Sequence, residues 1–251
     1  MVEHANIIAS VGQPKLIENV ARSVGNDNNG LHTEPFLGRA SMLCFLYGPG
    51  EPGRYPTKNK MSNEKPDDWN ELWDARLEAM ESVFGKSHDM IGHGTIPFNL
   101  GADMGGTADV IYFHNHVDGI VSVTAELIGN TDQVRNSMGS YELAFCSRSE
   151  ESWGPNIIGQ LAHYTLETAL EPGQTMDIGP ATPEGSTIAA FLFCDFARIT
   201  VRNENAGILL CVGITENELD YCRNGGRQQI ENLLKSNEMY PFTDLTRKSV
   251  V

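Results

Sequence analysis

A succession of short apolar segments between residues 108 and 213 restricts the chain to folds that contain a sheet. These segments are rich in Val, Ile, Phe and Tyr, and Gly, Pro, Asn and Asp separate them, which is typical of strands and turns. The predicted strands are residues 108–113, 119–128, 141–146, 174–178, 187–193 and 206–213, with a further short strand at 94–100. Alternation places Tyr141, Leu143 and Phe145 on one face of their strand. The last strand is almost entirely apolar, which predicts a central position in the sheet.

Helical spacing of apolar residues appears on both sides of these strands. The clearest helix is predicted over residues 67–84, ending at Gly85, with apolar side chains directed to a core: Trp69, Leu72, Trp73, Leu77, Met80 and Phe84. Further helices are predicted over 154–170, 215–222 and 226–235, and Thr215 with Glu218 matches a capping box. The fold class that follows is α+β, with a mixed, mostly antiparallel β-sheet and helices packed against it.

Residues 1–66 differ in composition from the rest of the chain. A short helix is predicted over 14–24 and a strand over 41–47, and the stretch after Tyr47 is rich in Gly, Pro and Lys, as in linkers. We therefore predict an N-terminal extension and linker over residues 1–66 and one domain over 67–251. Met61 lies within the linker and is a candidate for an alternative translation start.

The charge of the chain limits its partners. The sequence has 33 acidic and 18 basic residues, a formal net charge of −15, which disfavours nucleic acid and anionic membranes and suits a basic protein partner. The five scattered cysteines form no CxxC pair, and neither a signal peptide nor a long apolar span is present. We expect a cytoplasmic protein without disulfides.

Evidence for catalysis is weak in the sequence. No nucleophile elbow, Walker A loop or strand-linked GxGxxG motif occurs, so neither an enzyme nor a cofactor is predicted. His114 and His116 lie two residues apart, a spacing that lets both imidazoles of a strand reach one metal ion, with Glu126 or Asp118 as an oxygen ligand. A polar strand end beside a turn is the favoured interpretation, and a metal-dependent enzyme using His114 and His116 is kept as the alternative.

Several segments, in their order along the chain, resemble the Suppressor of fused family. The helix over 67–84 and the Gly-Gly loop before the strand at 108 are similar to the opening of the family domain. The other similar segments are GIVSVTAELIGN, YELAF, WGPNIIGQLAHY, GILLCVGITENEL and FTDLTRKSV. The resemblance covers residues 67–251. The family's Trp-Pro is interrupted here by Gly154, and His163 stands where the family has Arg.

The resemblance implies a non-enzymatic protein-binding domain. In animals the family member clamps a short peptide as an added β-strand, and stand-alone bacterial relatives look like immunity proteins that neutralise toxins. The chain is therefore expected to be an immunity-type protein with a basic toxin as its partner, or a peptide-binding regulator. Glu126 matches an acidic residue linked to peptide binding in the family. Tyr141, Asp244 and Arg247 also match its motifs and complete the candidate partner-binding set, although core anchoring and an Asp244–Arg247 pair that fixes the tail are favoured for them.

Overall fold

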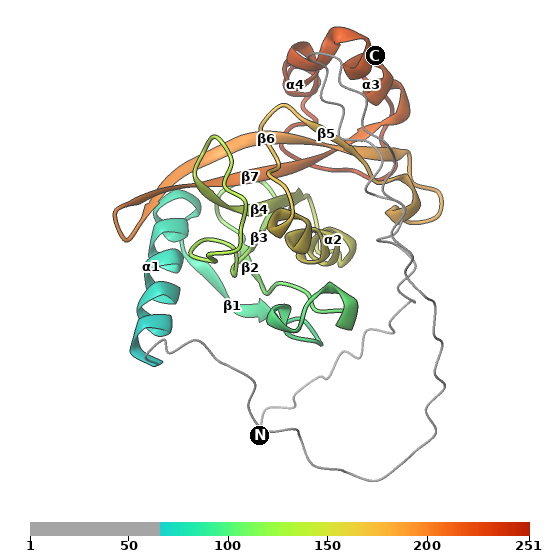
Figure 1. Ribbon diagram of the computed structural model, residues 1–251. Coiled ribbons are helices and arrows are strands. Elements are labelled where there is room, and N and C mark those ends of the chain that lie inside the picture. Colours follow the sequence, from blue (N-terminus) through green and yellow to red (C-terminus); the bar gives the residue numbers. More distant parts are fainter. Residues whose placement is uncertain (1–65) are drawn as a thin grey trace, which may run out of the picture.

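The computed structural model describes residues 66–251, in which a seven-stranded sheet carries helices on both faces (Figure 1). The strand order is β1-β2-β3-β4-β7-β6-β5. The strands are β1 (Ser87–Gly92), β2 (Val110–Phe113), β3 (Ile120–Thr124), β4 (Ser140–Ser147), β5 (Thr175–Asp177), β6 (Ile188–Val201) and β7 (Glu204–Thr215). The β4–β7 pair is parallel and all other pairs are antiparallel, so the predicted mixed, mostly antiparallel α+β fold is confirmed.

The longest pairing in the sheet is the β6–β7 hairpin, which extends well beyond the two apolar segments that predicted it. Its turn passes through Arg202 and Asn203, both with positive φ. The Arg202 guanidinium lies 2.7 Å from the Asp68 carboxylate, which ties the tip of the hairpin to the start of the first helix. This contact joins residues far apart in the sequence, so local sequence patterns did not predict how far the β6–β7 hairpin extends.

One face of the sheet packs against α1 (Pro66–Phe84), α3 (Glu216–Tyr221) and α4 (Arg227–Ser236). Met80 and Phe84 of α1 are buried there, as the helical spacing predicts. Trp69 is an exception, because 54% of it is exposed. Its ring stacks on Trp73 with centroids 5.8 Å apart, so it contacts a neighbouring ring and solvent rather than the sheet.

The opposite face packs against α2 (Trp153–Leu161), which continues as the 3₁₀-helix η4 (Ala162–Leu166). The predicted helix over 154–170 is therefore correct in position but too long. Tyr141, Leu143 and Phe145 of β4 all contribute to this core, which confirms the predicted alternation. Gly154 is required at the start of α2, since a Cβ there would lie 2.2 Å from the Phe145 ring.

The helix ends follow the local signals in the sequence. Gly85 has φ of 80° and its amide donates to the Glu81 carbonyl, which ends α1. Thr215 and Glu218 form the predicted capping box at the start of α3. Between α3 and α4 the chain kinks over η6 (Cys222–Gly226), where Asn224 and Gly225 have non-helical dihedral angles. The remaining short 3₁₀-helices are η2 (Phe98–Leu100), η3 (Ala102–Met104) and η5 (Gly179–Ala181).

Some other predictions are wrong or lie outside the described residues. The strand predicted over 94–100 is wrong: the segment holds an isolated bridge at Pro97 and the helix η2, and β1 lies earlier. The helix over 14–24, the strand over 41–47 and the linker lie outside the described residues, so the domain boundary stays a prediction. Within residues 66–251, no helix combines the length and apolar character that crossing a membrane requires. The four cysteines of that range are unpaired and buried, and burial raises the pKa of each thiol.

Candidate partner-binding site

Glu126, the family-matched acidic residue, lies in the turn after β3 and is half-buried. Its carboxylate accepts a hydrogen bond of 2.9 Å from the Asp109 amide. The Asp109 carboxylate in turn contacts the His93 ring at 2.8 Å and accepts from the Gly94 amide at 3.1 Å. The partial burial of this carboxyl group raises the pKa of Glu126.

A buried polar network lies directly beneath this turn. Glu142 of β4 is fully buried and accepts from the Leu127 and Ile128 amides at 2.9 and 2.8 Å. Thr124 donates its hydroxyl to the same carboxylate at 2.6 Å, and Arg76 of α1 donates to the Ala125 carbonyl. The Arg76 guanidinium also lies 4.0 Å from Glu142. Burial nevertheless dominates and raises the pKa of Glu142 to about 7.

This network shows what the sequence analysis missed. Arg76 lies on the apolar face of a predicted helix, and helical spacing identifies that position. The spacing does not predict that the buried Glu142 is the acid close to the Arg76 charge. Because the two residues belong to different elements, only the packing of α1 against the sheet brings them together. The consequence is a fixed backbone at the turn that carries Glu126.

Tyr141 is fully buried in the core between the sheet and α2. Its hydroxyl accepts a hydrogen bond of 2.9 Å from the Leu170 amide, and burial raises the pKa of its phenol to about 12. This position corresponds to the core anchor that the sequence favours. Partner binding through Tyr141 remains an untested prediction.

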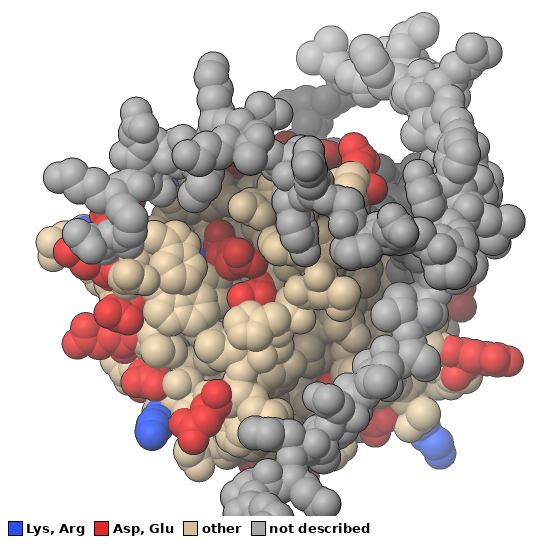
Figure 2. Space-filling model, turned by 90° about the horizontal axis from the view of Figure 1, so that it is seen from below, with Lys and Arg blue, Asp and Glu red and all other residues tan. Residues whose placement is uncertain are grey.

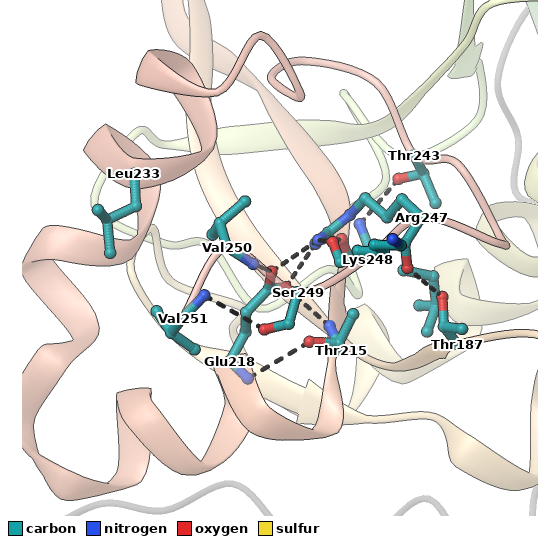
Figure 3. A network of polar contacts seen from close by, with 12 residues as sticks. Thr187, Thr215, Glu218, Leu233, Thr243, Arg247, Lys248, Ser249, Val250 and Val251 are labelled. Carbon is teal, nitrogen blue, oxygen red and sulfur yellow. Dashed lines mark hydrogen bonds and ion pairs between the residues drawn. The ribbon is translucent and has the colours of Figure 1, made fainter.

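Arg247 is buried in a network at the C-terminal tail, shown in Figure 3. Its guanidinium donates to Glu218 at 2.6 Å, to the Gly213 carbonyl at 2.9 Å and to the Lys248 carbonyl at 3.0 Å. Glu218 also accepts from the Val250 amide at 2.9 Å. The expected Asp244–Arg247 pair is therefore wrong, because the acid that pairs with Arg247 is Glu218.

The pairing determines the ionisation of Glu218. Burial by itself raises the pKa of this carboxyl, but the hydrogen bonds from Arg247, Thr215 and Val250 outweigh burial and hold the pKa below its ordinary value. Glu218 thus serves two roles, as the N3 residue of the capping box and as the anchor of the tail. The Glu218 carboxylate and the Gly213 carbonyl together fix the tail to α3 and β7.

Asp244 is exposed and turns its carboxylate to Thr246, accepting from the amide at 2.8 Å and the hydroxyl at 3.0 Å. It lies away from Glu126. The neighbouring Thr243 amide donates to the Cys146 carbonyl, and Cys146 pairs with Val121 near the start of β3, whereas Glu126 follows the end of that strand. The four candidate residues therefore do not form one cluster.

His114 and His116 have different surroundings. The His114 ring stacks on His88 at 4.8 Å, whereas His116 makes edge contacts with Phe84 at 5.0 Å and Phe196 at 5.8 Å. Within residues 66–251, no group of three or more His, Cys, Asp or Glu side chains is placed to hold a metal ion. The structure therefore gives the suggested metal site no support.

A cleft of about 160 Å³ lies on the sheet beside the His88–His114 pair. Met90 of β1, Tyr112 of β2 and Glu151 after β4 contribute to its wall. Sequence patterns gave no signal for this cleft, because its residues come from separate strands and gather only when the sheet forms.

The end of the molecule at β1 carries several exposed apolar side chains. Met90 is 65% exposed, Leu100 56% and Met104 63%. Leu100 and Met104 belong to the segment between β1 and β2, which Figure 1 draws at the same end of the molecule as β1. Figure 2 shows this face as mostly uncharged, with acidic groups in and around it and few basic ones.

Comparison with known proteins identifies a family. A family model described as Suppressor of fused protein (SUFU) matches residues 115–248, just over half of the chain. No curated protein sequence matches. Among solved structures, a SUFU homolog from Neisseria gonorrhoeae FA 1090 aligns with a TM-score of 0.53 and 16% identity, over 72% of this chain and 98% of the homolog.

Two further structures share the fold. The Sufu-Fu complex aligns with a TM-score of 0.51 and 13% identity, over 71% of this chain and 92% of that one. Drosophila Suppressor of Fused gives a TM-score of 0.54 and 12% identity over 71% of this chain. The aligned part spans 51% of the Drosophila protein, so it corresponds to about half of that molecule.

Proposed function

The chain belongs to the Suppressor of fused family, and on that premise we propose that it acts by binding a protein partner through the face at β1. One solved relative is described as a complex between Sufu and Fu, which supports protein binding as the kind of activity. The observation that carries the proposal is the set of exposed apolar side chains on this face, Met90, Leu100 and Met104. We define these three residues as the β1 face.

Large apolar side chains that remain in water on a folded domain mark surfaces that another molecule can cover. Covering one such side chain contributes roughly 1.5–3 kcal/mol, so three of them supply a substantial part of the affinity of a protein complex. Acidic groups lie in and around the side of the molecule seen in Figure 2, and the whole chain carries a net charge of −15. A basic partner would be attracted by that field and associate faster.

The two edges of the sheet favour side-chain docking over strand addition. β1 has an irregularity in register between Ser87 and Ile91, and the Met90 amide already donates to the His88 ring at 3.1 Å. The opposite edge, β5, has only three residues. Bulges and very short strands hinder the addition of another strand, so the partner is proposed to dock on side chains of the β1 face.

The finer function is one of the two expected from the sequence, an immunity-type protein that neutralises a toxin or a regulator of another protein. Both fit a partner with a basic surface and an apolar centre. The identity of the partner separates them, since a nuclease or another toxin would support the first and a regulatory protein the second.

The test is capture of partners from native cells with the tagged full chain, followed by mass spectrometry and titration calorimetry with the purified partner. We compare the wild type with a variant carrying Met90→Ser, Leu100→Ser and Met104→Ser, each checked for folding by circular dichroism. The control variant carries Val134→Ser and Val251→Ser, which are also exposed. We expect the triple variant to bind at least tenfold more weakly and the control to match the wild type. Equal affinity of all three proteins, or no stoichiometric partner of the wild type, would overturn the proposal.

A further inference from the structure

The cleft beside the β1 face lies on the side of the sheet that α2 covers further along. Tyr112 of β2 pairs with Ser122 of β3, and Ser122 pairs with Phe145 of β4, which packs in the core beneath α2. α2 does not cover the part of the sheet around Tyr112, and a cleft of about 160 Å³ opens there. That volume suits one long side chain rather than a separate metabolite.

The charged groups that the described residues bring to the cleft are acidic. Glu150 and Glu151 line it, and no Lys or Arg of residues 66–251 does. Among residues 66–251, neither carboxylate makes an ion pair. Glu151 is half-buried and accepts from the Gly154 amide at 3.0 and 3.1 Å, which fixes its position at the start of α2. Burial raises the pKa of Glu151, so this carboxylate gains from a cation that enters the cleft.

Three planar rings also line the cleft. Tyr112 is half-buried, and the His88 and His114 rings stack at 4.8 Å with an interplanar angle of 24°. The hydrogen bond from the Met90 amide to His88 fixes one ring of this pair. Met90 itself lines the cleft and belongs to the β1 face, so the two surfaces are continuous.

A cleft lined by carboxylates and flat rings matches a guanidinium group better than an ammonium group. A guanidinium is planar, can stack on an aromatic ring and can donate two parallel hydrogen bonds to a carboxylate, whereas an ammonium is a compact and strongly hydrated charge. We propose that this cleft takes an arginine side chain of the protein partner, with Glu150 and Glu151 binding the charge and Tyr112 packing against its plane. The inference rests on the proposed function for the source of the arginine, but the cleft can be tested without that partner.

The direct probe is N-acetylarginine methylamide, titrated into the full chain labelled with ¹³C in its methionine methyl groups. The Met90 signal is assigned with a Met90→Leu variant, and Met138, which is buried, serves as an internal reference. The expected result is a saturable shift of the Met90 signal with the arginine probe, and a shift at least tenfold weaker with the neutral citrulline analogue. The lysine analogue is expected to bind more weakly than arginine. An unchanged Met90 signal, equal binding of citrulline, or tighter binding of lysine would overturn the inference.

The matched variants carry Glu150→Gln with Glu151→Gln in one case and Glu78→Gln with Glu184→Gln in the other. Both pairs remove the same charge, but Glu78 and Glu184 are exposed and do not line the cleft. Gln at 151 retains an acceptor for the Gly154 amide, and folding is checked by circular dichroism. We expect only the cleft variant to lose arginine binding, by at least tenfold, and retention of binding by it would count against the assignment.

The same variants separate the two proposals. If the captured partner needs the β1 face but binds the cleft variant with wild-type affinity, the arginine assignment fails and the proposed function stands. If the Met90 signal responds to arginine but no protein partner exists, the proposed function fails and the cleft remains an arginine site.

Discussion

Replacement of Arg247 by methionine removes a buried cation and leaves its buried acid behind. In the wild type, Arg247 and Glu218 are only 5% and 0% exposed and are joined by direct hydrogen bonds. Methionine fills part of the same volume but donates no hydrogen bond. Glu218 then keeps its bonds from the Thr215 and Val250 amides and loses its counter-charge.

The expected loss is roughly 3–5 kcal/mol of unfolding free energy at neutral pH, because breaking a buried pair leaves an uncompensated charge in a medium of low polarity. The sign of the pH dependence follows from the lowered pKa of Glu218. The pair stabilises the fold fully above the ordinary pKa of 4.5, and this stability is lost as pH falls through the pKa of the folded state. The difference between wild type and variant should therefore narrow in acid.

Guanidinium chloride unfolding, followed by far-ultraviolet circular dichroism at neutral and acid pH, measures both effects. The matched control is Arg198→Met, which removes an exposed ion pair with Asp195 and should cost less than about 1 kcal/mol. A loss below about 1 kcal/mol for Arg247→Met at neutral pH would refute the reasoning. So would a difference from wild type that grows as the pH is lowered.

Three further predictions test other parts of the fold. Thr215→Ala removes the side-chain acceptor of the capping box and should cost about 1 kcal/mol, measured by denaturant unfolding; an unchanged midpoint would contradict this role. Because burial raises the pKa of Glu142 to about 7, the folded protein keeps a proton that the unfolded chain has lost above pH 4.5. As the pH rises from 4.5 to about 7, the free energy of unfolding of the wild type should thus fall by about 3 kcal/mol, and that of Glu142→Gln should not. Parallel pH profiles of the two proteins would exclude a raised pKa for Glu142. Phe84→Ala should lower the free energy of unfolding by about 3–5 kcal/mol and Trp69→Ala by less than about 1 kcal/mol, because Phe84 is buried and Trp69 is exposed. Thermal unfolding measures both, and a larger loss for Trp69→Ala than for Phe84→Ala would contradict this reasoning.

Local features of this fold could be predicted because their causes lie within a few residues. The spacing of Met80 and Phe84 located α1 and its core face, and Thr215 with Glu218 located the start of α3. The alternation in β4 correctly placed Tyr141 on one side of the sheet. The family resemblance rested on short segments of the same kind, and the family model matches much of that region, residues 115–248.

Other local patterns predicted the wrong structure, or too short an element, because neighbours in space changed the outcome. The apolar residues of 94–100 suggested a strand, but that segment forms an isolated bridge to Thr107 and a 3₁₀ turn. The strand at 187–193 proved to be the first part of a much longer β6, whose outer half is stabilised by pairing with β7. Neither result depends on the residues of the segment alone.

The sequence by itself determined the class of fold, the main helices and strands, and the acidic character that suits a basic partner. Only the tertiary structure decided that β4 and β7 lie parallel, that Glu218 rather than Asp244 pairs with Arg247, and that Tyr112 and Glu151 share a cleft. The physical reason is the range of the interactions. Periodicity and capping act between residues a few positions apart, whereas buried ion pairs and clefts join side chains whose separation is set by the packing of the whole sheet.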